Sequence, residues 1–340
     1  MSNPAGKKSD TLYDLVWRPM QPFLKGIKKV AISPAGLLNR IAFSALPSGN
    51  YKYLLDEYQI RQYGSSGEIA EQKNNNDRPK SGNNAVLYGG ILFDQTDTKN
   101  TSKNLIAVTS SSLPYEVKRS ISGRKWGPLP GTLKEVRDIN KLLLDSHFST
   151  KVITSSDATE ESLKQLSGHS PQILHLATHG FFLPDVAGKP GNLRNENGQL
   201  TFADNPLFRS GIIMAGANRV WCGGLAIEGK DDGILTAYEI SNIDLSNTDL
   251  VVLSACETAL GDIKGTEGVF GLQRAFKFAG VKEMLLSLWD IPDKQTSELM
   301  ELFYANKLKG MPSYQALNFA QQIMRKKYAP YYWAAFELIE

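Results

Sequence analysis

From about residue 85 onward, short apolar runs alternate with segments in which apolar residues recur every three or four positions. The runs have the length of strands buried on both faces, and the intervening segments have the period of helices that cover a sheet. This alternation predicts an α/β protein, a three-layer αβα sandwich around a mainly parallel sheet of at least six strands. The predicted strands of this region are residues 85–92, 151–154, 173–177, 250–255, 284–288 and 333–339.

Five helices are predicted between and around these strands. The first is expected to begin at Thr132, because Thr132 and Glu135 have the spacing of a capping box, in which two side chains cap the backbone at a helix start. The other four are predicted at residues 159–166, from residue 266 onward, at 293–306 and at 313–327.

The first 84 residues have a less regular pattern. An amphipathic helix is predicted at residues 11–24, with Leu12, Leu15, Val16 and Met20 on its apolar face, and strands are predicted at 29–33 and 58–63. A polar, low-complexity segment (QKNNNDRPKSGNN) then spans residues 72–84. We therefore divide the chain into an N-terminal part, 1–84, and a core, 85–340.

The core contains a long insertion at residues 182–249, rich in Gly, Asn, Asp and Pro in its first part. Loops of this length at the functional edge of a domain usually flank a binding site. We expect the insertion to flank the substrate.

Two reactive side chains follow two of the predicted strands. Cys256 closes the apolar run that begins at Leu250, and His179 comes directly after the run 173–177. The carboxyl ends of parallel strands are where open α/β sheets place their ligands. A helix start and a nearby imidazole both favour a thiolate, so Cys256 is a candidate nucleophile with His179 as its partner.

Composition excludes several other classes of protein. The net charge of +3 is small and the basic residues are scattered, which argues against a nucleic-acid or anionic membrane partner. No apolar stretch has the length of a signal peptide or a membrane span, so we expect a cytoplasmic protein. The two cysteines, Cys222 and Cys256, are then expected to be free thiols, and we predict no structural zinc and no cofactor.

Several blocks of the sequence together resemble one known family. The blocks are ILHLATHG (173–180), LFRSGIIMAGAN (207–218), GILTAYE (233–239), LVVLSACETALG (250–261), GVFGLQRAF (268–276), SLWD (287–290) and PYYWAAF (330–336). With these blocks the chain is similar to CHAT domains, caspase-like cysteine peptidases of clan CD that are related to separases and caspases and are often fused to tetratricopeptide repeats. The resemblance covers nearly the whole chain, since residues 29–46 and 54–63 also look like the N-terminal part of such domains.

The resemblance implies a caspase-like fold and a role for each dyad residue. Cys256 would be the nucleophile and His179 the general acid/base, while the backbone N–H groups of Gly180 and Cys256 would hold the oxyanion. The sequence around Cys256 is Ser-Ala-Cys-Glu-Thr rather than the caspase pattern Gln-Ala-Cys-x-Gly. Caspase specificity for aspartate is therefore not expected here.

Similarity to separases around Trp289 and Asp290 implies cleavage after Arg or Lys, with Asp290 pairing with the basic P1 side chain. Trp289 and Glu257 are further candidates for contacting substrate. Asp293 could take the role of Asp290, but it follows Pro292 and precedes a helical pattern, so we expect it to be an N-cap.

The remaining motifs have structural interpretations. His175 is expected to be a hydrogen-bonded core histidine on the same sheet face as His179, and Cys222 an incidental thiol. The glycines of residues 265–271 have the wrong spacing for a dinucleotide site and are expected to serve either close helix-to-sheet packing or flexibility near the nucleophile. The basic segment 119–125 is expected to be a solvated loop, with self-cleavage there as the alternative.

Three functions follow from these residues. The first is a regulated cysteine endopeptidase that cuts one or a few protein substrates and is switched by a fused or separate sensor of the tetratricopeptide type, in bacterial signalling or defence. The second is a binding or signalling module that keeps the fold without useful turnover. The third, a thiol-dependent acyl-transferring hydrolase, is disfavoured because no nucleophile-elbow motif surrounds Cys256.

Overall fold

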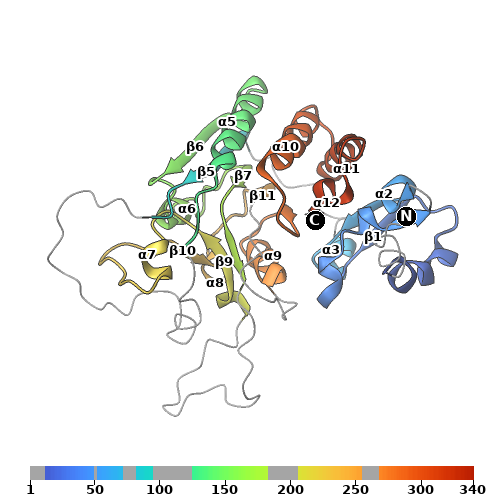
Figure 1. Ribbon diagram of the computed structural model, residues 1–340, viewed down its shortest axis with the longest axis horizontal. Helices are drawn as coiled ribbons and strands as arrows, with labels where there is room; N and C mark the ends of the chain where they lie inside the picture. The colour runs from blue at the N-terminus through green and yellow to red at the C-terminus, as the bar shows by residue number, and fades with distance from the viewer. Residues whose placement is uncertain (1–11, 50–51, 72–81, 95–124, 183–205, 255–267) are drawn as a thin grey trace, which may run out of the picture.

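An eight-stranded sheet is the framework of the molecule (Figure 1). The computed structural model describes residues 12–49, 52–71, 82–94, 125–182, 206–254 and 268–340. All neighbouring strands of the sheet are parallel except β12 and β13. In spatial order the strands are β1 (Lys29–Ile32), β4 (Gln59–Gln62), β13 (Phe336–Ile339), β12 (Glu283–Ser287), β11 (Leu250–Leu253), β7 (Ile173–Leu176), β5 (Asn84–Ile91) and β6 (Ser149–Ser155).

Two smaller sheets accompany the large one. The three-stranded sheet has the antiparallel order β10 (Ile234–Thr236), β9 (Ser210–Ile213), β8 (Gly180–Phe182), and the two-stranded sheet pairs β2 (Pro47–Gly49) with β3 (Lys52–Tyr53). The described part of the 182–249 insertion therefore belongs to the core, because Ile212, Ile213 and Leu235 of the three-stranded sheet are 1% exposed or less.

Helices cover both faces of the large sheet. Figure 1 shows α5, α10 and α11 on one side, and α6, α8 and α9 on the other. The α-helices are α2 (Leu54–Glu57), α3 (Ser66–Glu71), α5 (Pro130–Asp145), α6 (Glu160–Lys164), α7 (Asn218–Trp221), α8 (Ala237–Ile240), α9 (Gly268–Phe278), α10 (Asp293–Lys307), α11 (Ser313–Met324) and α12 (Pro330–Trp333). The 3-10 helices are η1 (Arg18–Leu24), η2 (Gly36–Arg40), η3 (Phe43–Ala45) and η6 (Pro206–Phe208).

Strand alternation divides the core into two apolar clusters, one on each side of the sheet. On β5, Leu87 faces α5 and α10, whereas Tyr88 faces α6 and the three-stranded sheet. On β11, Val252 faces the same side as Leu87, and Val251 faces the same side as Tyr88. The three-layer arrangement and the mainly parallel sheet are those predicted from the alternating apolar runs.

Helix α5 begins two residues earlier than predicted, and the proposed capping box is wrong. The helix starts at Pro130, which suits a first position because it needs no N–H there. The Thr132 hydroxyl donates to the Leu129 carbonyl (2.7 Å) and accepts from the Gly90 N–H (2.9 Å). Glu135 is therefore not used to cap the helix and turns into the protein, where it contacts His175.

The N-terminal helix also differs from its prediction. Residues 12–16 are α-helical and η1 continues them, but the fully buried side chain is Trp17, with Tyr13 6% exposed, whereas Leu15 is 71% exposed. The aromatic rings determine the buried face, because they pack with Phe43 and Leu54 in a small separate cluster.

The last strand is shorter than predicted. Residues 330–333 form α12, and β13 begins only at Phe336 and runs antiparallel to β12. Pro330 at the first helical position favours this short helix. Helix α12 lets the chain reverse before it enters the sheet. The prediction of one strand that begins at Trp333 is therefore wrong.

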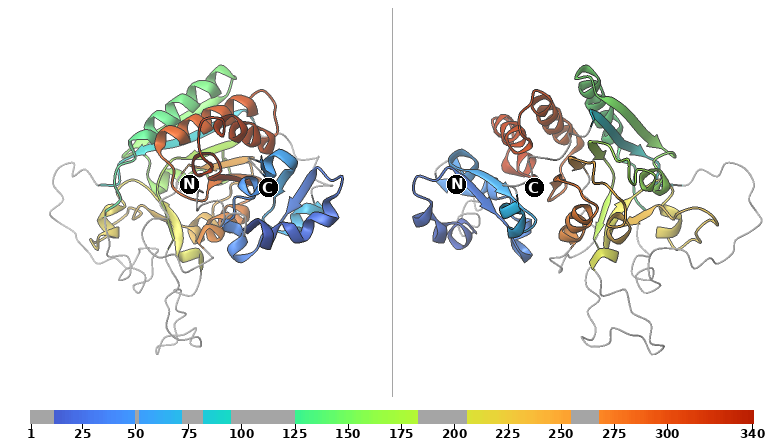
Figure 2. Two further views of the ribbon diagram at one scale, coloured as in Figure 1. Left: turned by 45° about the vertical axis from the view of Figure 1, so that its right-hand side comes forward. Right: turned by 180° about the vertical axis from the view of Figure 1, so that it is seen from behind.

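The N-terminal part contributes strands β1 and β4 to the large sheet, where β4 lies beside β13. Glu340 N–H donates to the Gln62 carbonyl (2.8 Å), and Arg61 Nε donates to the Glu340 carboxylate (2.9 Å). The N-terminal part lies beside β13 and the C-terminus in all views (Figures 1 and 2). The predicted division at residue 84 separates two parts of one continuous sheet; the domain division itself stays a prediction.

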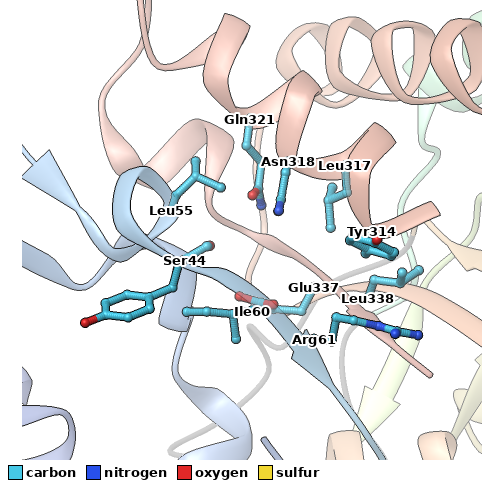
Figure 3. A pocket seen from close by; sticks show the side chains of 11 residues that line it. Ser44, Leu55, Ile60, Arg61, Tyr314, Leu317, Asn318, Gln321, Glu337 and Leu338 are labelled. Atoms are coloured by element: carbon cyan, nitrogen blue, oxygen red, sulfur yellow. The ribbon is translucent and has the colours of Figure 1, made fainter. Parts of the chain in front are cut away.

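A small polar cavity lies between the N-terminal part and the core. It measures about 20 Å³, room for about one water molecule. Figure 3 shows Asn318 and Gln321 of α11 projecting toward Glu337 of β13 and Ser44. Within the described chain, neither Glu337 Oε1 nor Gln321 Oε1 has a hydrogen-bond partner. Burial raises the pKa of Glu337 to about 8, although the nearby Ser44 hydroxyl acts in the opposite direction.

We predict that Glu337→Gln stabilises the protein more at pH 8 than at pH 5. The folded state keeps a proton on Glu337 that the unfolded chain releases above its ordinary pKa of 4.5, so this side chain destabilises the fold increasingly as the pH rises to about 8. The expected gain is about 2–4 kcal/mol at pH 8 and under about 1 kcal/mol at pH 5, measured by urea denaturation.

The matched control is Glu298→Gln. Lys327 lowers the pKa of Glu298, so removing this charge should cost stability at neutral pH, by less than about 1 kcal/mol. An equal gain from Glu337→Gln at both pH values would contradict the prediction.

Candidate active site

A cavity of about 250 Å³ lies at the edge of the sheet where the parallel strands end. His179 lines it from beyond β7 and Ser254 from the end of β11. The segment after β12 contributes Trp289 and Asp290, and helix α5 contributes Glu135. The parallel register of β7, β11 and β12 is what brings these residues from distant parts of the chain to one place.

The His179 ring has a defined proton position. Its Nε2 atom lies 2.7 Å from the carbonyl oxygen of Gly127. Because a carbonyl oxygen can only accept, Nε2 carries the proton in the neutral ring, and Nδ1 is the nitrogen that can take up a proton from another group. His179 is therefore arranged as a base through Nδ1 and can act as an acid after protonation there.

Two aromatic rings hold the imidazole of His179. The centroids of Phe93 and Trp126 each lie 4.9 Å from it. Asn218 fixes both aromatic segments, because its side chain accepts from the Trp126 N–H (2.8 Å) and donates to the Trp126 carbonyl (3.0 Å), while its own N–H donates to the Phe93 carbonyl (3.0 Å).

Gly180 begins β8, next to His179. The Ile213 N–H donates to the His179 carbonyl (2.9 Å), and Gly180 is opposite Ile212 in the register. Gly180 and Ile212 are therefore a non-hydrogen-bonded antiparallel pair, in which the Gly180 N–H points away from β9. This direction is compatible with the predicted oxyanion role, which stays a prediction.

The predicted substrate residues Trp289 and Asp290 both line the cavity that holds His179. Trp289 is half-buried, and its indole N–H donates to the Tyr331 carbonyl (2.8 Å). Asp290 is exposed, and its backbone carbonyl accepts from the Tyr331 hydroxyl (2.6 Å). Tyr331 thus orients the segment on which both candidates lie.

The prediction that Asp293 is the N-cap of its own helix is wrong. Pro292 occupies that position, and Asp293 is the first helical residue. Its carboxylate instead accepts a hydrogen bond from the Gly131 N–H (2.8 Å), one of the unpaired donors in the first turn of α5. A Cβ at Gly131 would lie 2.2 Å from Oδ2 of Asp293, so the glycine permits this contact. Asp293 also lines the cavity.

His175 is a core histidine, as predicted. It is fully buried, with Nε2 3.0 Å from Glu135 Oε1 and Nδ1 3.1 Å from the Tyr304 hydroxyl. The prediction that His175 and His179 lie on the same face of one strand is wrong, because β7 ends at Leu176, before His179.

Cys256 and Glu257 lie outside the described residues, and so do residues 119–124 and 265–267 of two other motifs. Ser254, two residues before Cys256 in the sequence, lines the cavity with His179. Cys222 is an exposed free thiol at the end of α7.

Comparison with known proteins agrees with the sequence resemblance. The family model described as "CHAT domain" matches residues 6–340. This chain belongs to the CHAT family. Human "Tetratricopeptide repeat protein 28" is 24% identical over 347 residues, which cover 96% of this CHAT domain but 13% of the human protein. The mouse protein of the same name is 27% identical over 224 residues, covering 63% of this chain and 9% of that protein.

A solved structure resembles the CHAT domain in fold. It is the Arg-specific cysteine proteinase gingipain R, with a TM-score of 0.51 and 10% identity, covering 96% of this chain and 67% of the proteinase. At this identity the likeness concerns the fold, and it confirms the predicted caspase-like α/β class.

Neither a metal centre nor a membrane span is found in the described residues of the CHAT domain. No three His, Cys, Asp or Glu side chains there are grouped to hold a metal ion. None of the helices in the same residues combines the length and the apolar composition needed to cross a bilayer.

Sequence reasoning missed two residues that the CHAT domain places at the site, Glu135 and Asn218. The spacing from Thr132 predicts that Glu135 caps the helix, and only its position on the buried face of α5 indicates otherwise. Asn218 ends the block LFRSGIIMAGAN, but its partners Phe93 and Trp126 are far away in the sequence.

We predict that Asn218→Ala destabilises the CHAT domain by about 2–4 kcal/mol, because it leaves the buried N–H and carbonyl of Trp126 without partners. Urea denaturation measures this loss. Asn242→Ala serves as the control, since its exposed amide donates only to the Tyr238 carbonyl, and it should cost under about 1 kcal/mol. Equal losses for the two variants would show that Asn218 does not clamp Trp126.

Proposed function

We propose that this CHAT domain is a cysteine endopeptidase that cuts one or a few protein substrates. In the proposed reaction the Cys256 sulfur gives its proton to Nδ1 of His179 and attacks the scissile carbonyl carbon. The backbone N–H of Gly180 donates to the oxyanion, and the protonated His179 delivers its proton to the leaving amine. Water then hydrolyses the thioester, with His179 again taking and returning a proton.

The observation that carries this proposal is the state of His179 at the cavity. Its Nε2 is occupied by the Gly127 carbonyl, and its ring is packed between Phe93 and Trp126. A histidine that served only packing would not need to line a cavity of about 250 Å³ beside the end of β11, the strand that leads to Cys256 in the sequence.

The proposed substrate side chain at P1 is Arg or Lys. Asp290 lines the cavity and would attract a cation at its mouth, and Trp289 offers an aromatic surface to the stem of such a side chain. Glu257, next to Cys256 in the sequence, is a further proposed contact.

Control by a sensor module is also proposed. The mammalian relatives are named for tetratricopeptide repeats, and the CHAT domain spans 13% and 9% of their lengths. Repeat arrays bind proteins along extended concave surfaces. We therefore propose that such a module, fused or separate, presents the substrate or releases a latent activity in the cytoplasm.

We expect a thiol-reactive peptide electrophile to label the wild-type protein and not Cys256→Ala. Cys222 is the control thiol, so Cys222→Ala should be labelled like the wild type. His179→Ala should slow labelling about 100-fold or more, because no other group is proposed to take the thiol proton. Mass spectrometry of the adduct measures all three.

Labelling that persists in Cys256→Ala would exclude Cys256 as the nucleophile. A lack of labelling in the wild type, with the proposed partner module present, would favour the alternative of a binding or signalling module with the same fold.

For P1 preference, we predict that peptides with Arg or Lys are cut faster than those with Leu or Met. Because Asp290 is exposed, Asp290→Asn should lower kcat/KM for P1 Arg by only about two- to fivefold. Activity on P1 Leu should not change. Faster cleavage after Leu than after Arg in the wild type would overturn the basic preference.

A further inference from the structure

The cavity beside His179 contains a second, deeply placed carboxylate. Glu135 of α5 lines it and is 4% exposed, whereas Asp290 and Asp293 are exposed. A buried charge interacts with a ligand far more strongly than a solvated one, because less water screens it. Of the three carboxylates, Glu135 has the environment in which a charge discriminates most between ligands.

Two buried side chains hold Glu135 in place. Its Oε1 lies 3.0 Å from His175 Nε2, and His175 Nδ1 lies 3.1 Å from the Tyr304 hydroxyl. Burial and the neighbouring Glu135 charge raise the pKa of Tyr304, so its hydroxyl keeps its proton and can donate to Nδ1. Nε2 then carries the ring proton and donates to Glu135. In this arrangement the Glu135 carboxylate accepts from His175 and is held in a fixed direction.

No Lys or Arg of the described chain contacts this carboxylate. His175 is its only hydrogen-bond partner there, its second oxygen Oε2 makes no hydrogen bond in the described chain, and no Lys or Arg is among the described residues that line the cavity. A cationic ligand that reaches Oε2 can therefore form a buried, charge-assisted hydrogen bond. The described lining thus has three carboxylates and lacks a fixed cation.

We propose that Glu135 is the specificity-determining residue that binds the guanidinium or ammonium group of a basic substrate side chain, with His175 and Tyr304 as positioning residues. The site rests on the proposed peptidase function, since the bound side chain is that of P1. A cavity of about 250 Å³ has room for one long basic side chain, which would enter past Asp290 and end at Glu135.

The test measures binding of p-aminobenzamidine, an aromatic amidinium probe, by its fluorescence in the Cys256→Ala protein, where turnover plays no part. We expect saturable binding that Glu135→Gln weakens at least about tenfold. Glutamine keeps an acceptor for His175, so this variant retains the buried hydrogen bond. Asp138→Asn on the same helix removes the same charge from a pair with Lys134 and should leave binding unchanged.

Tyr304→Phe tests the positioning role separately. Without the hydroxyl, His175 loses one of its two hydrogen-bond partners and no longer fixes the direction of Glu135. Tyr304→Phe should therefore weaken probe binding about two- to fivefold, and this loss should vanish in the Glu135→Gln background. An equal loss in both backgrounds would exclude the positioning role.

The outcomes separate this inference from the peptidase function. If the electrophile labels Cys256 but the probe does not bind, or binds equally to Glu135→Gln, Glu135 is not the specificity residue. If the probe binds through Glu135 but Cys256 does not react, the cation site stands and the peptidase function fails.

Discussion

The site depends on the parallel pairing of β7 with β5 and β11. In this register the three strands end together, so residues that follow them share one edge of the sheet. No short-range interaction could bring Ser254 to the same cavity as His179. Strand β13 runs antiparallel beside β12, and the helix before it places Tyr331 against the Trp289 segment.

A backbone carbonyl and two aromatic rings orient the His179 imidazole. The Gly127 carbonyl fixes the position of the Nε2 proton, and Phe93 and Trp126 fix the ring plane. The Gly127 carbonyl is a neutral acceptor, so it orients the imidazole without placing a charge beside it. Asn218 also acts through neutral groups, since its side-chain amide holds the segment of Trp126 by hydrogen bonds to the backbone.

Local patterns in the sequence were sufficient for the fold class and for the strands that end at the site. The run at 173–177 indicates where His179 belongs, and the run that begins at Leu250 indicates the strand that ends beside it, because buried parallel strands leave a strong apolar signal. Long-range contacts were not visible in this way. Thr132 and Glu135 have capping-box spacing, yet Gly90 and His175 are their partners, and Asp293 caps α5 rather than α10. In each case a tertiary contact replaced the local one that spacing predicts.

His175 shows why the structural and the functional interpretation of a buried polar residue need not compete. Its two hydrogen bonds satisfy a fully buried ring, which is the requirement of a core residue. One of those bonds ends on Glu135, which lines the cavity, so satisfying the core also fixes the direction of a carboxylate at the site. Replacing a buried polar network with well-packed apolar side chains is often neutral for stability, so stability alone does not account for this one. The proposed cation site gives the network between α5, β7 and α10 a second role, because the same hydrogen bonds fix the direction of Glu135.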